Sequence, residues 1–134
     1  MKKAVNAGFK DAFYDLAVCY EVGLGVRKNP LKAAEFYMRA ADALDKEAYS
    51  EVARIYYWGL GTDRDYYQAR VFFLKAAKSG DMESAFNLAR MYLRAEGGNQ
   101  NLRGAAQWLI KAMKAEGETG RMATDLYDDA FSKD

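Results

Sequence analysis

The chain of 134 residues contains no histidine, and this absence narrows its chemistry more than any other feature of its composition. Histidine is the most common general base and zinc ligand of enzymes, and it completes the Ser-His and Cys-His catalytic arrangements. Most hydrolytic mechanisms therefore lose their usual centre. The acidic pair Asp128 and Asp129 is adjacent in sequence, so its carboxylates point in different directions, which indicates solvated charges. We expect a protein that is not an enzyme, with no cofactor and no bound metal.

Cysteine and proline each occur once, as Cys19 and Pro30. A single cysteine cannot form an internal disulfide, which agrees with a reducing compartment. No run approaches about 18 apolar residues, so no membrane span is predicted. The N-terminus carries cations without a following apolar stretch, unlike a secretory signal. We expect a cytoplasmic protein, with export after cleavage of a leader as the open alternative.

The net charge is also small, at +1 from 20 basic and 19 acidic residues. A balanced charge creates no overall field that would concentrate the chain on nucleic acid or on an anionic membrane. With 51% hydrophobic residues the chain has ample material for the core of one domain. We therefore expect a folded protein that binds neither nucleic acid nor membrane.

What the sequence does contain is a pattern that returns every 36 positions. Apolar residues within each copy recur at spacings of three and four, as in an amphipathic helix; in the first copy they are Phe13, Leu16, Ala17, Tyr20 and Leu24. A repeat of this length is typical of stacked helical hairpins. Small residues that keep the step are predicted contact points between closely packed helices, and they are Ala17, Ala53, Ala89, Ala40, Ala76 and Ala112.

Turn and capping residues follow the same step. Glycines are predicted to end the first helix of each copy in the left-handed conformation, namely Gly23 and Gly25, then Gly59 and Gly61, with Ala95 before Gly97 and Gly98 in the third copy. Short polar side chains are predicted to cap the second helix, and these are Asn29, Asp65 and Asn101. Pro30 then occupies the first helical position, where its missing N–H has no cost.

The full order, Ala-x-x-x-Leu-(Gly/Ala)-x-x-Tyr-x-x-Gly-x-Gly followed by Asx-x-x-(Lys/Gln)-Ala-x-x-aromatic-x-x-(Lys/Arg)-Ala-Ala, resembles the Sel-1-like repeat, a relative of the tetratricopeptide repeat. The resemblance extends from Ala12 to Ala41, from Ala48 to Ala77 and from Ser84 to Ala112. Alanine replaces the usual glycine of the family at three positions, and Ser84 replaces the first alanine. The resemblance implies an all-α fold, a right-handed α-solenoid of antiparallel helix hairpins with a tetratricopeptide-like superhelix.

On this basis residues 1–134 are predicted to form a single Sel-1-like repeat domain. Residues 1–8 match the tail of a preceding helix or form a cap, and the repeats cover 9–43, 44–79 and 80–116. Residues 117–134 are predicted to be a C-terminal capping helix, because a last repeat otherwise exposes an apolar face. Its polar side is predicted to carry Asp125, Asp128 and Asp129.

The resemblance also implies a function, which is protein–protein interaction as an adaptor or scaffold, in assembly, signalling or bacterial host contact. In tetratricopeptide relatives the first helix of each repeat lines a concave binding face. By that analogy the partner-binding residues here are Tyr14, Val18, Arg54, Tyr57, Trp58, Phe86, Arg90 and Arg94. We expect the partner to be another protein or peptide, and the chain itself to be a monomer or weak homodimer.

Arg54 and Arg90 occupy one repeat position, and Arg94 follows one helical turn later. Arginines beside aromatic residues suit a partner with acidic groups, because guanidinium and carboxylate form forked hydrogen bonds. Three alternatives stay open. Tyr57 and Phe86 would instead pack between repeats; the chain would instead be a small bacterial inhibitor or immunity-type protein that caps a toxin or enzyme; or it would read RNA, against which the balanced charge argues.

Overall fold

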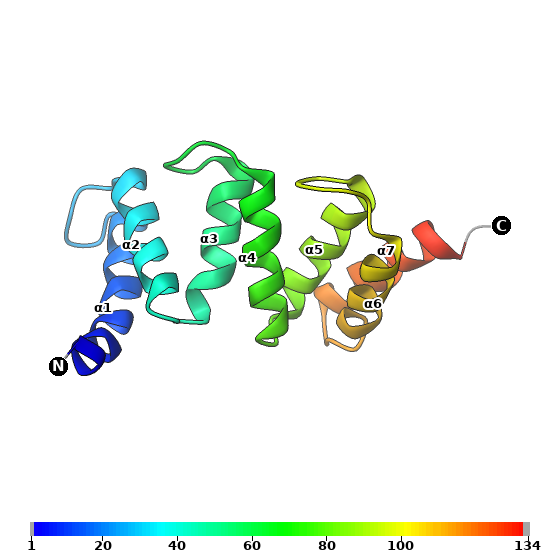
Figure 1. Ribbon diagram of the computed structural model, residues 1–134, viewed down its shortest axis with the longest axis horizontal. Coiled ribbons are helices and arrows are strands. Elements are labelled where there is room, and N and C mark those ends of the chain that lie inside the picture. Colours follow the sequence, from blue (N-terminus) through cyan, green and yellow to red (C-terminus); the bar gives the residue numbers. More distant parts are fainter. Residues whose placement is uncertain (1, 133–134) are drawn as a thin grey trace. The chain divides into compact units, whose positions relative to one another are not determined.

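A computed structural model describes the backbone of residues 2–132 and the side chains of residues 12–132 (Figure 1). Within this range the chain forms seven α-helices and no strand, so the predicted all-α fold is confirmed. The prediction for residues 1–8 depends on side chains that lie outside the described residues.

The helices follow one another at the repeat spacing predicted from the sequence. They are α1 (Lys2–Val22), α2 (Pro30–Asp42), α3 (Glu47–Trp58), α4 (Tyr66–Lys78), α5 (Met82–Arg94), α6 (Leu102–Ala112) and α7 (Glu118–Phe131). The chain divides into two compact units, Met1–Ala69 and Arg70–Asp134, with the boundary inside α4. Each unit is described by itself below.

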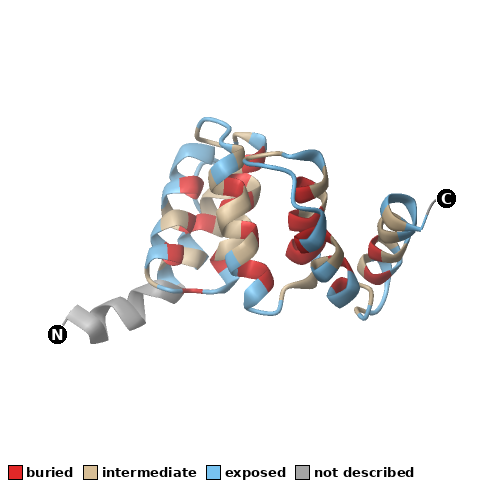
Figure 2. Cartoon of the chain, turned by 45° about the vertical axis from the view of Figure 1, so that its right-hand side comes forward, coloured by how far each residue is buried: buried red, intermediate tan, exposed pale blue. Residues whose placement is uncertain are grey.

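In the first unit α2 packs against both α1 and α3. The predicted contact points Ala17, Ala40 and Ala53 are fully buried. Buried segments (red) recur along the helices in Figure 2. Two expected members of the apolar stripe are exposed instead, Leu16 by 41% and Leu24 by 66%. Leu24 is exposed because α1 ends at Val22 and leaves it in the turn.

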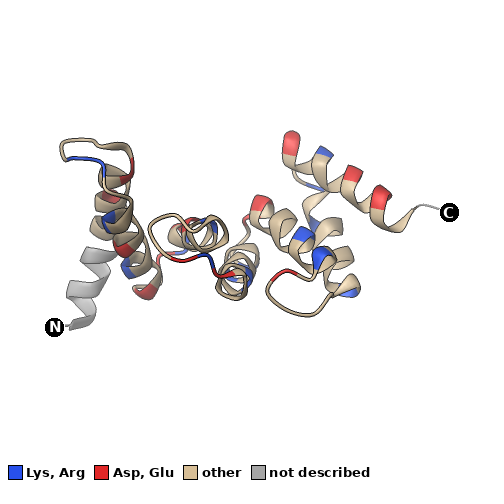
Figure 3. Cartoon of the chain, turned by 90° about the horizontal axis from the view of Figure 1, so that it is seen from above, with Lys and Arg blue, Asp and Glu red and all other residues tan. Residues whose placement is uncertain are grey.

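In the second unit α5 packs against α6 and α7, and α6 also packs against α7. Leu88, Met91 and Leu109 are completely buried in this core. The helix expected near the C-terminus is α7, which buries Ala123. Its aspartates at 125, 128 and 129 are exposed as expected, and acidic residues (red) recur along this helix in Figure 3.

All three turns after the first helix of a repeat share one geometry. Gly23 and Gly59 take positive φ angles of 77° and 69°, and the following N–H groups reach back to Cys19 and Ile55 carbonyls at 2.9 and 3.0 Å. In the third repeat Ala95 adopts φ 54°, and the next N–H bonds to the Met91 carbonyl at 3.0 Å. The turn therefore persists without its glycine, at the cost of holding an alanine in the left-handed region.

The predicted capping residues are confirmed in all three repeats. The side-chain oxygens of Asn29, Asp65 and Asn101 accept hydrogen bonds from the N–H three residues later, at 3.2, 3.1 and 2.8 Å. Their own N–H groups donate to the carbonyls of Tyr20, Tyr56 and Tyr92 at 2.8, 2.8 and 3.1 Å. The backbone bonds fix the loop length between the two helices, and the side-chain caps explain why Asn or Asp recurs at this position. Pro30 begins α2 as predicted.

The loops that follow α3 and α5 are closed by different contacts. In the first unit the loop backbone touches the start of α2, since a Cβ on Gly61 would lie 2.4 Å from the Pro30 carbonyl oxygen. In the second unit Arg70 donates from Nε to the Glu96 carbonyl at 2.9 Å and from Nη1 to the Asn99 carbonyl at 3.1 Å. One loop is therefore closed by backbone contact and the other by an arginine side chain.

Candidate functional site

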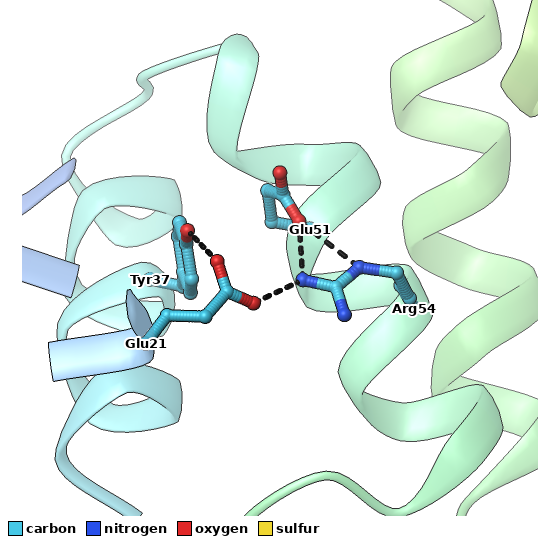
Figure 4. A network of polar contacts seen from close by, with 4 residues as sticks. All are labelled: Glu21, Tyr37, Glu51 and Arg54. Carbon is cyan, nitrogen blue, oxygen red and sulfur yellow. Dashed lines mark hydrogen bonds and ion pairs between the residues drawn. The ribbon is translucent and has the colours of Figure 1, made fainter. Parts of the chain in front are cut away.

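The most organised polar group of the first unit joins three helices (Figure 4). It consists of Glu21 from α1, Tyr37 from α2, and Glu51 and Arg54 from α3. The three charged side chains are partly accessible, with exposed fractions of 36% for Glu21, 25% for Glu51 and 37% for Arg54. The network therefore forms part of the surface and also ties the helices together.

Arg54 is the centre of this network. Its Nη2 lies 2.7 Å from Glu21 Oε2 and 2.6 Å from Glu51 Oε1, and its Nε donates to the same Glu51 oxygen at 3.1 Å. Partial burial disfavours the charged guanidinium, but the bonds to Glu51 and Glu21 outweigh it and raise the pKa of Arg54. Two carboxylates therefore neutralise this arginine from within the chain.

Tyr37 supports the network from the core. It is only 1% exposed, and its hydroxyl donates to Glu21 Oε1 at 2.8 Å. Burial and this hydrogen bond raise the pKa of Tyr37 far above its ordinary value, so the hydroxyl remains a donor. At Glu21, burial acts to raise the pKa, but hydrogen bonds from Arg54 and Tyr37 outweigh it and lower the pKa of the carboxyl. The Tyr37 hydroxyl and the Glu21 carboxylate thus hold each other in one orientation.

Two predicted binding residues on α1 lie beside the network. The ring of Tyr14 meets that of Tyr37 edge-on, with centroids 5.4 Å apart. Burial raises the pKa of Tyr14, and the negative charges of Glu51 and Glu47 raise it further. Val18 is half-buried one helical turn after Tyr14. Their surroundings therefore carry more negative than positive charge.

Tyr57 and Trp58 differ in what they offer a partner. Tyr57 is 7% exposed and lies between Trp58 and Tyr66, with ring centroids 5.0 and 4.9 Å away. Trp58 is 58% exposed, and it follows Arg54 by four residues, which places both on one face of α3. Trp58 is thus an accessible aromatic side chain, and Tyr57 forms the packed surface beneath it.

In the second unit the predicted residues all lie on α5. Phe86 is 8% exposed, and the Arg90 guanidinium lies 5.6 Å from the centroid of its ring. Arg90 is half-buried; its Nη2 donates to Asn87 Oδ1 at 3.3 Å, and its Nε is buried without a hydrogen-bond partner. Arg94 is exposed in the last turn. The ladder that would join Arg54 to Arg90 stays a prediction, because these residues belong to different units.

Sequence reasoning missed the residues that pair with Arg54. The spacing of Glu51 and Arg54, at i and i+3 on a helix, was an available signal for an ion pair. Glu21 lies 33 residues before Arg54, so no local pattern pointed to it. Tyr37 aligns with Phe73 and Leu109, both buried, and its extra hydroxyl was the one hint of a polar partner in the core.

Other kinds of site find no support in the described part of the chain. Residues 12–132 contain no group of three or more His, Cys, Asp or Glu side chains arranged to hold a metal ion. The helices of the same range include none with the length and apolar character of a membrane span. Cys19 is half-buried and free.

These features define an all-α helical-repeat protein. The sequence profile of the Sel1 repeat matches residues 11–43, 46–81 and 83–115. The chain therefore belongs to the Sel1 repeat family, which confirms the resemblance read from its sequence. Members of this family are generally protein–protein interaction modules, and they are typically non-enzymatic.

Solved bacterial structures share the fold. A Sel1 repeat protein from Oxalobacter formigenes is 29% identical with a TM-score of 0.81, covering 92% of this chain and 51% of that chain. A protective antigen of uropathogenic Escherichia coli with an SLR fold is 28% identical with a TM-score of 0.85, covering 96% of this chain and 28% of that one. This chain thus spans about half of the first relative and just over a quarter of the second.

A more distant structure matches along its whole length. The cysteine-rich protein B of Helicobacter pylori has a TM-score of 0.63 at 15% identity, covering 94% of this chain and 97% of that chain. This likeness shows the fold alone. Comparison with curated proteins gave no match.

Proposed function

We propose that this chain is an adaptor or scaffold that binds a partner protein through side chains on the first helices of its repeats. The observation that carries the proposal is the network of Glu21, Tyr37, Glu51 and Arg54, which is held in one geometry and partly open to solvent (Figure 4). Side chains already fixed before binding lose little conformational entropy when a partner arrives. A fixed, accessible network of this kind suits recognition.

Trp58 is the proposed anchor of this surface. It is 58% exposed, although tryptophan is among the most hydrophobic side chains, and it is held edge-on by the buried ring of Tyr57. Tryptophan is enriched among the residues that dominate the binding energy of protein interfaces. A partner that covers Trp58 would also reach Arg54 and its carboxylates one helical turn away.

The charge of this surface indicates what the partner presents to it. Two carboxylates surround one guanidinium in the network. The negative charges of Glu47 and Asp45 also act on Tyr14, whose pKa they raise. We therefore propose that the partner segment over the first unit offers hydrogen-bond donors and an apolar side chain. Acidic groups of a partner would have to bind elsewhere on the chain.

Replacing Trp58 tests the proposal. The tagged chain would capture partners from a lysate of its source organism; a captured protein, identified by mass spectrometry, would be purified and its affinity measured calorimetrically. Trp58→Ala should weaken binding by about 2 kcal/mol, or roughly 30-fold. Tyr67→Ala is the control, because Tyr67 is equally exposed at 63% on α4. Unchanged affinity of Trp58→Ala, or equal losses in both variants, would place the interface elsewhere.

A further inference from the structure

Arg54 and Arg90 occupy the same repeat position, 36 residues apart, but they have different neighbours. Arg54 makes three contacts of 2.6 to 3.1 Å with two carboxylates. Arg90 makes one contact of 3.3 Å, with the neutral amide of Asn87. Within the described residues of the second unit no carboxylate forms an ion pair with Arg90, and its Nε is buried without a hydrogen-bond acceptor. No carboxylate of the second unit therefore neutralises the positive charge of Arg90.

The sequence explains this difference. The repeat step carries Glu51, which pairs with Arg54 from three residues earlier on the helix, to Asn87, which has no charge. The same step carries Glu21, the second partner of Arg54, to Tyr57. Both carboxylates are thus replaced at once. A buried side-chain nitrogen without an acceptor calls for an explanation. Among the described residues Arg70 Nη2 is a second such atom, but the other nitrogens of Arg70 bind two loop carbonyls.

The surroundings of Arg90 hold its guanidinium in place for a ligand. The group lies 5.6 Å from the centroid of the buried Phe86 ring, and Asn87 binds its Nη2. Arg94 lies one helical turn further along α5, so a second positive charge is close. Glu83, the carboxylate of α5, is seven residues away, about 10 Å along the helix axis, and Glu96 follows Arg90 by six residues in the loop after the helix.

We propose that Arg90 binds a carboxylate from an acidic segment of the partner protein, through its terminal nitrogens. The inference rests on the proposed function and names the chemistry of one contact. The first unit supplies the pattern, because Glu21 occupies Nη2 of Arg54 in the way that a partner's Asp or Glu would occupy a terminal nitrogen of Arg90. The buried Nε remains inside the chain and is not a ligand contact.

The test uses two synthetic peptides and the whole chain. One rhodamine-labelled, amidated peptide contains four Glu-Ser repeats, and its matched control contains four Gln-Ser repeats. Fluorescence anisotropy at low salt should show saturable binding of the first peptide and at least tenfold weaker binding of the second. Arg90→Gln should weaken the acidic peptide at least fivefold. Arg103→Gln removes the same charge from an exposed position on α6, and it should change the affinity less than twofold.

In a second variant the chain itself supplies a carboxylate to the Arg90 guanidinium. Asn87→Glu recreates the spacing of Glu51 and Arg54, so it should weaken the acidic peptide at least fivefold and leave the protein folded with an equal or higher Tm. Inorganic phosphate should displace no more peptide than sodium chloride of equal ionic strength.

Three results would overturn the assignment. These are equal losses in Arg90→Gln and Arg103→Gln, full affinity in Asn87→Glu, or strong displacement by phosphate, which would indicate a phosphorylated ligand. If any of these occurs and Trp58→Ala still weakens partner binding, the interaction role stands and the carboxylate contact at Arg90 falls. If Trp58→Ala has no effect but Arg90→Gln does, the proposed anchor falls instead.

Discussion

The two units place an arginine at the same repeat position and give it opposite surroundings. In the first unit Arg54 is neutralised by Glu21 and Glu51, so it stabilises the contact of α1 with α3. In the second unit Arg90 has a neutral neighbour and keeps its charge. The difference teaches that a repeat determines where a side chain lies, whereas residues outside the repeat signature determine which partners that side chain has within the chain.

The loops after α3 and α5 show a second difference of the same kind. Position 34 is alanine in the first repeat, and the following loop approaches so closely that only glycine fits at 61. The equivalent position in the second repeat is Arg70, whose guanidinium binds two loop carbonyls and lies 4.8 Å from the Tyr92 ring centroid. One loop depends on backbone contact and the other on a side chain.

The largest effect is expected from Gly61→Ala. The new Cβ would lie 2.4 Å from the Pro30 carbonyl oxygen, and φ is +82° at this position. Overpacking and a left-handed alanine each cost about 1 to 2 kcal/mol, so the free energy of unfolding should fall by about 3 kcal/mol in urea. Gly25→Ala is the control, because φ is +74° there with nothing within 4 Å of a Cβ. The free energy of unfolding of Gly25→Ala should fall by only about 1 kcal/mol. Equal losses in the two variants would refute the close backbone contact at Gly61.

Removing the two arginines should affect stability unequally. Arg54→Met leaves Glu21 and Glu51 without their cation and should cost about 1 to 2 kcal/mol, a value reduced by partial exposure of the pair. Arg90→Met removes one long bond to an amide and the contact of the guanidinium with the Phe86 ring, and it should cost about 0.5 kcal/mol. Urea unfolding of both variants measures the difference. Similar losses would show that Arg90 is also a stabilising residue.

Acidic pH should lower the stability of the first unit, because the Glu21 carboxylate becomes protonated. The pKa of its carboxyl is lowered from 4.5, so its ionised form stabilises the fold above about pH 4.5. This contribution is lost as the pH falls through the lowered pKa, because protonation breaks the pair with Arg54. Chemical unfolding from pH 6 to pH 3 should therefore show a smaller loss of stability for Glu21→Gln than for the wild type. An identical pH dependence in the two proteins would contradict the pairing.

The turns after α3 and α5 can be compared by exchanging glycine and alanine at the left-handed position of each turn. Ala95 takes φ 54° where Gly59 takes φ 69°. Ala95→Gly should stabilise the chain by about 0.5 to 1 kcal/mol, since relief of strain exceeds the entropy that glycine adds to the unfolded state. Gly59→Ala should destabilise it, with a Cβ 3.2 Å from the Arg64 nitrogen. Thermal unfolding of both variants tests this pair; a loss in Ala95→Gly would show that the alanine is unstrained.

The smallest expected change is that of Asn87→Glu. A glutamate three residues before Arg90 should stabilise α5 by about 0.2 to 0.5 kcal/mol at low salt, and the gain should shrink in 1 M salt because exposed pairs are screened. Calorimetric Tm values at the two salt concentrations measure it. A decrease in stability at low salt would mean that the Arg90 guanidinium cannot reach the new carboxylate.

The sequence predicts the fold well because its signals are local and recur. Asn29, Asp65 and Asn101 each cap a helix within three residues, and the left-handed turns follow from glycines at fixed positions. Ala95 stands where the first two turns have their first glycine, yet the turn keeps its geometry because the hydrogen bonds around it hold the backbone in place.

The candidate site was less predictable, because its contacts join distant parts of the chain. Glu21 and Arg54 are 33 residues apart, and no local sequence pattern near either residue predicts their ion pair. Tyr57 and Phe86 were ambiguous on a helical wheel, and packing against neighbouring rings or side chains leaves them 7% and 8% exposed. Periodicity assigns a residue to a helix face, but its partners depend on side chains from other helices.

The most direct test compares Arg54 and Arg90 in one experiment. The Nε–H resonances of both arginines would be followed by ¹H–¹⁵N NMR, with assignments from Arg54→Lys and Arg90→Lys, during titration with the peptide of four Glu-Ser repeats. Our account predicts that the Arg90 resonance shifts saturably and that the Arg54 resonance does not move, because its nitrogens already bind Glu21 and Glu51. Parallel shifts of both resonances, or a shift of Arg54 alone, would contradict it.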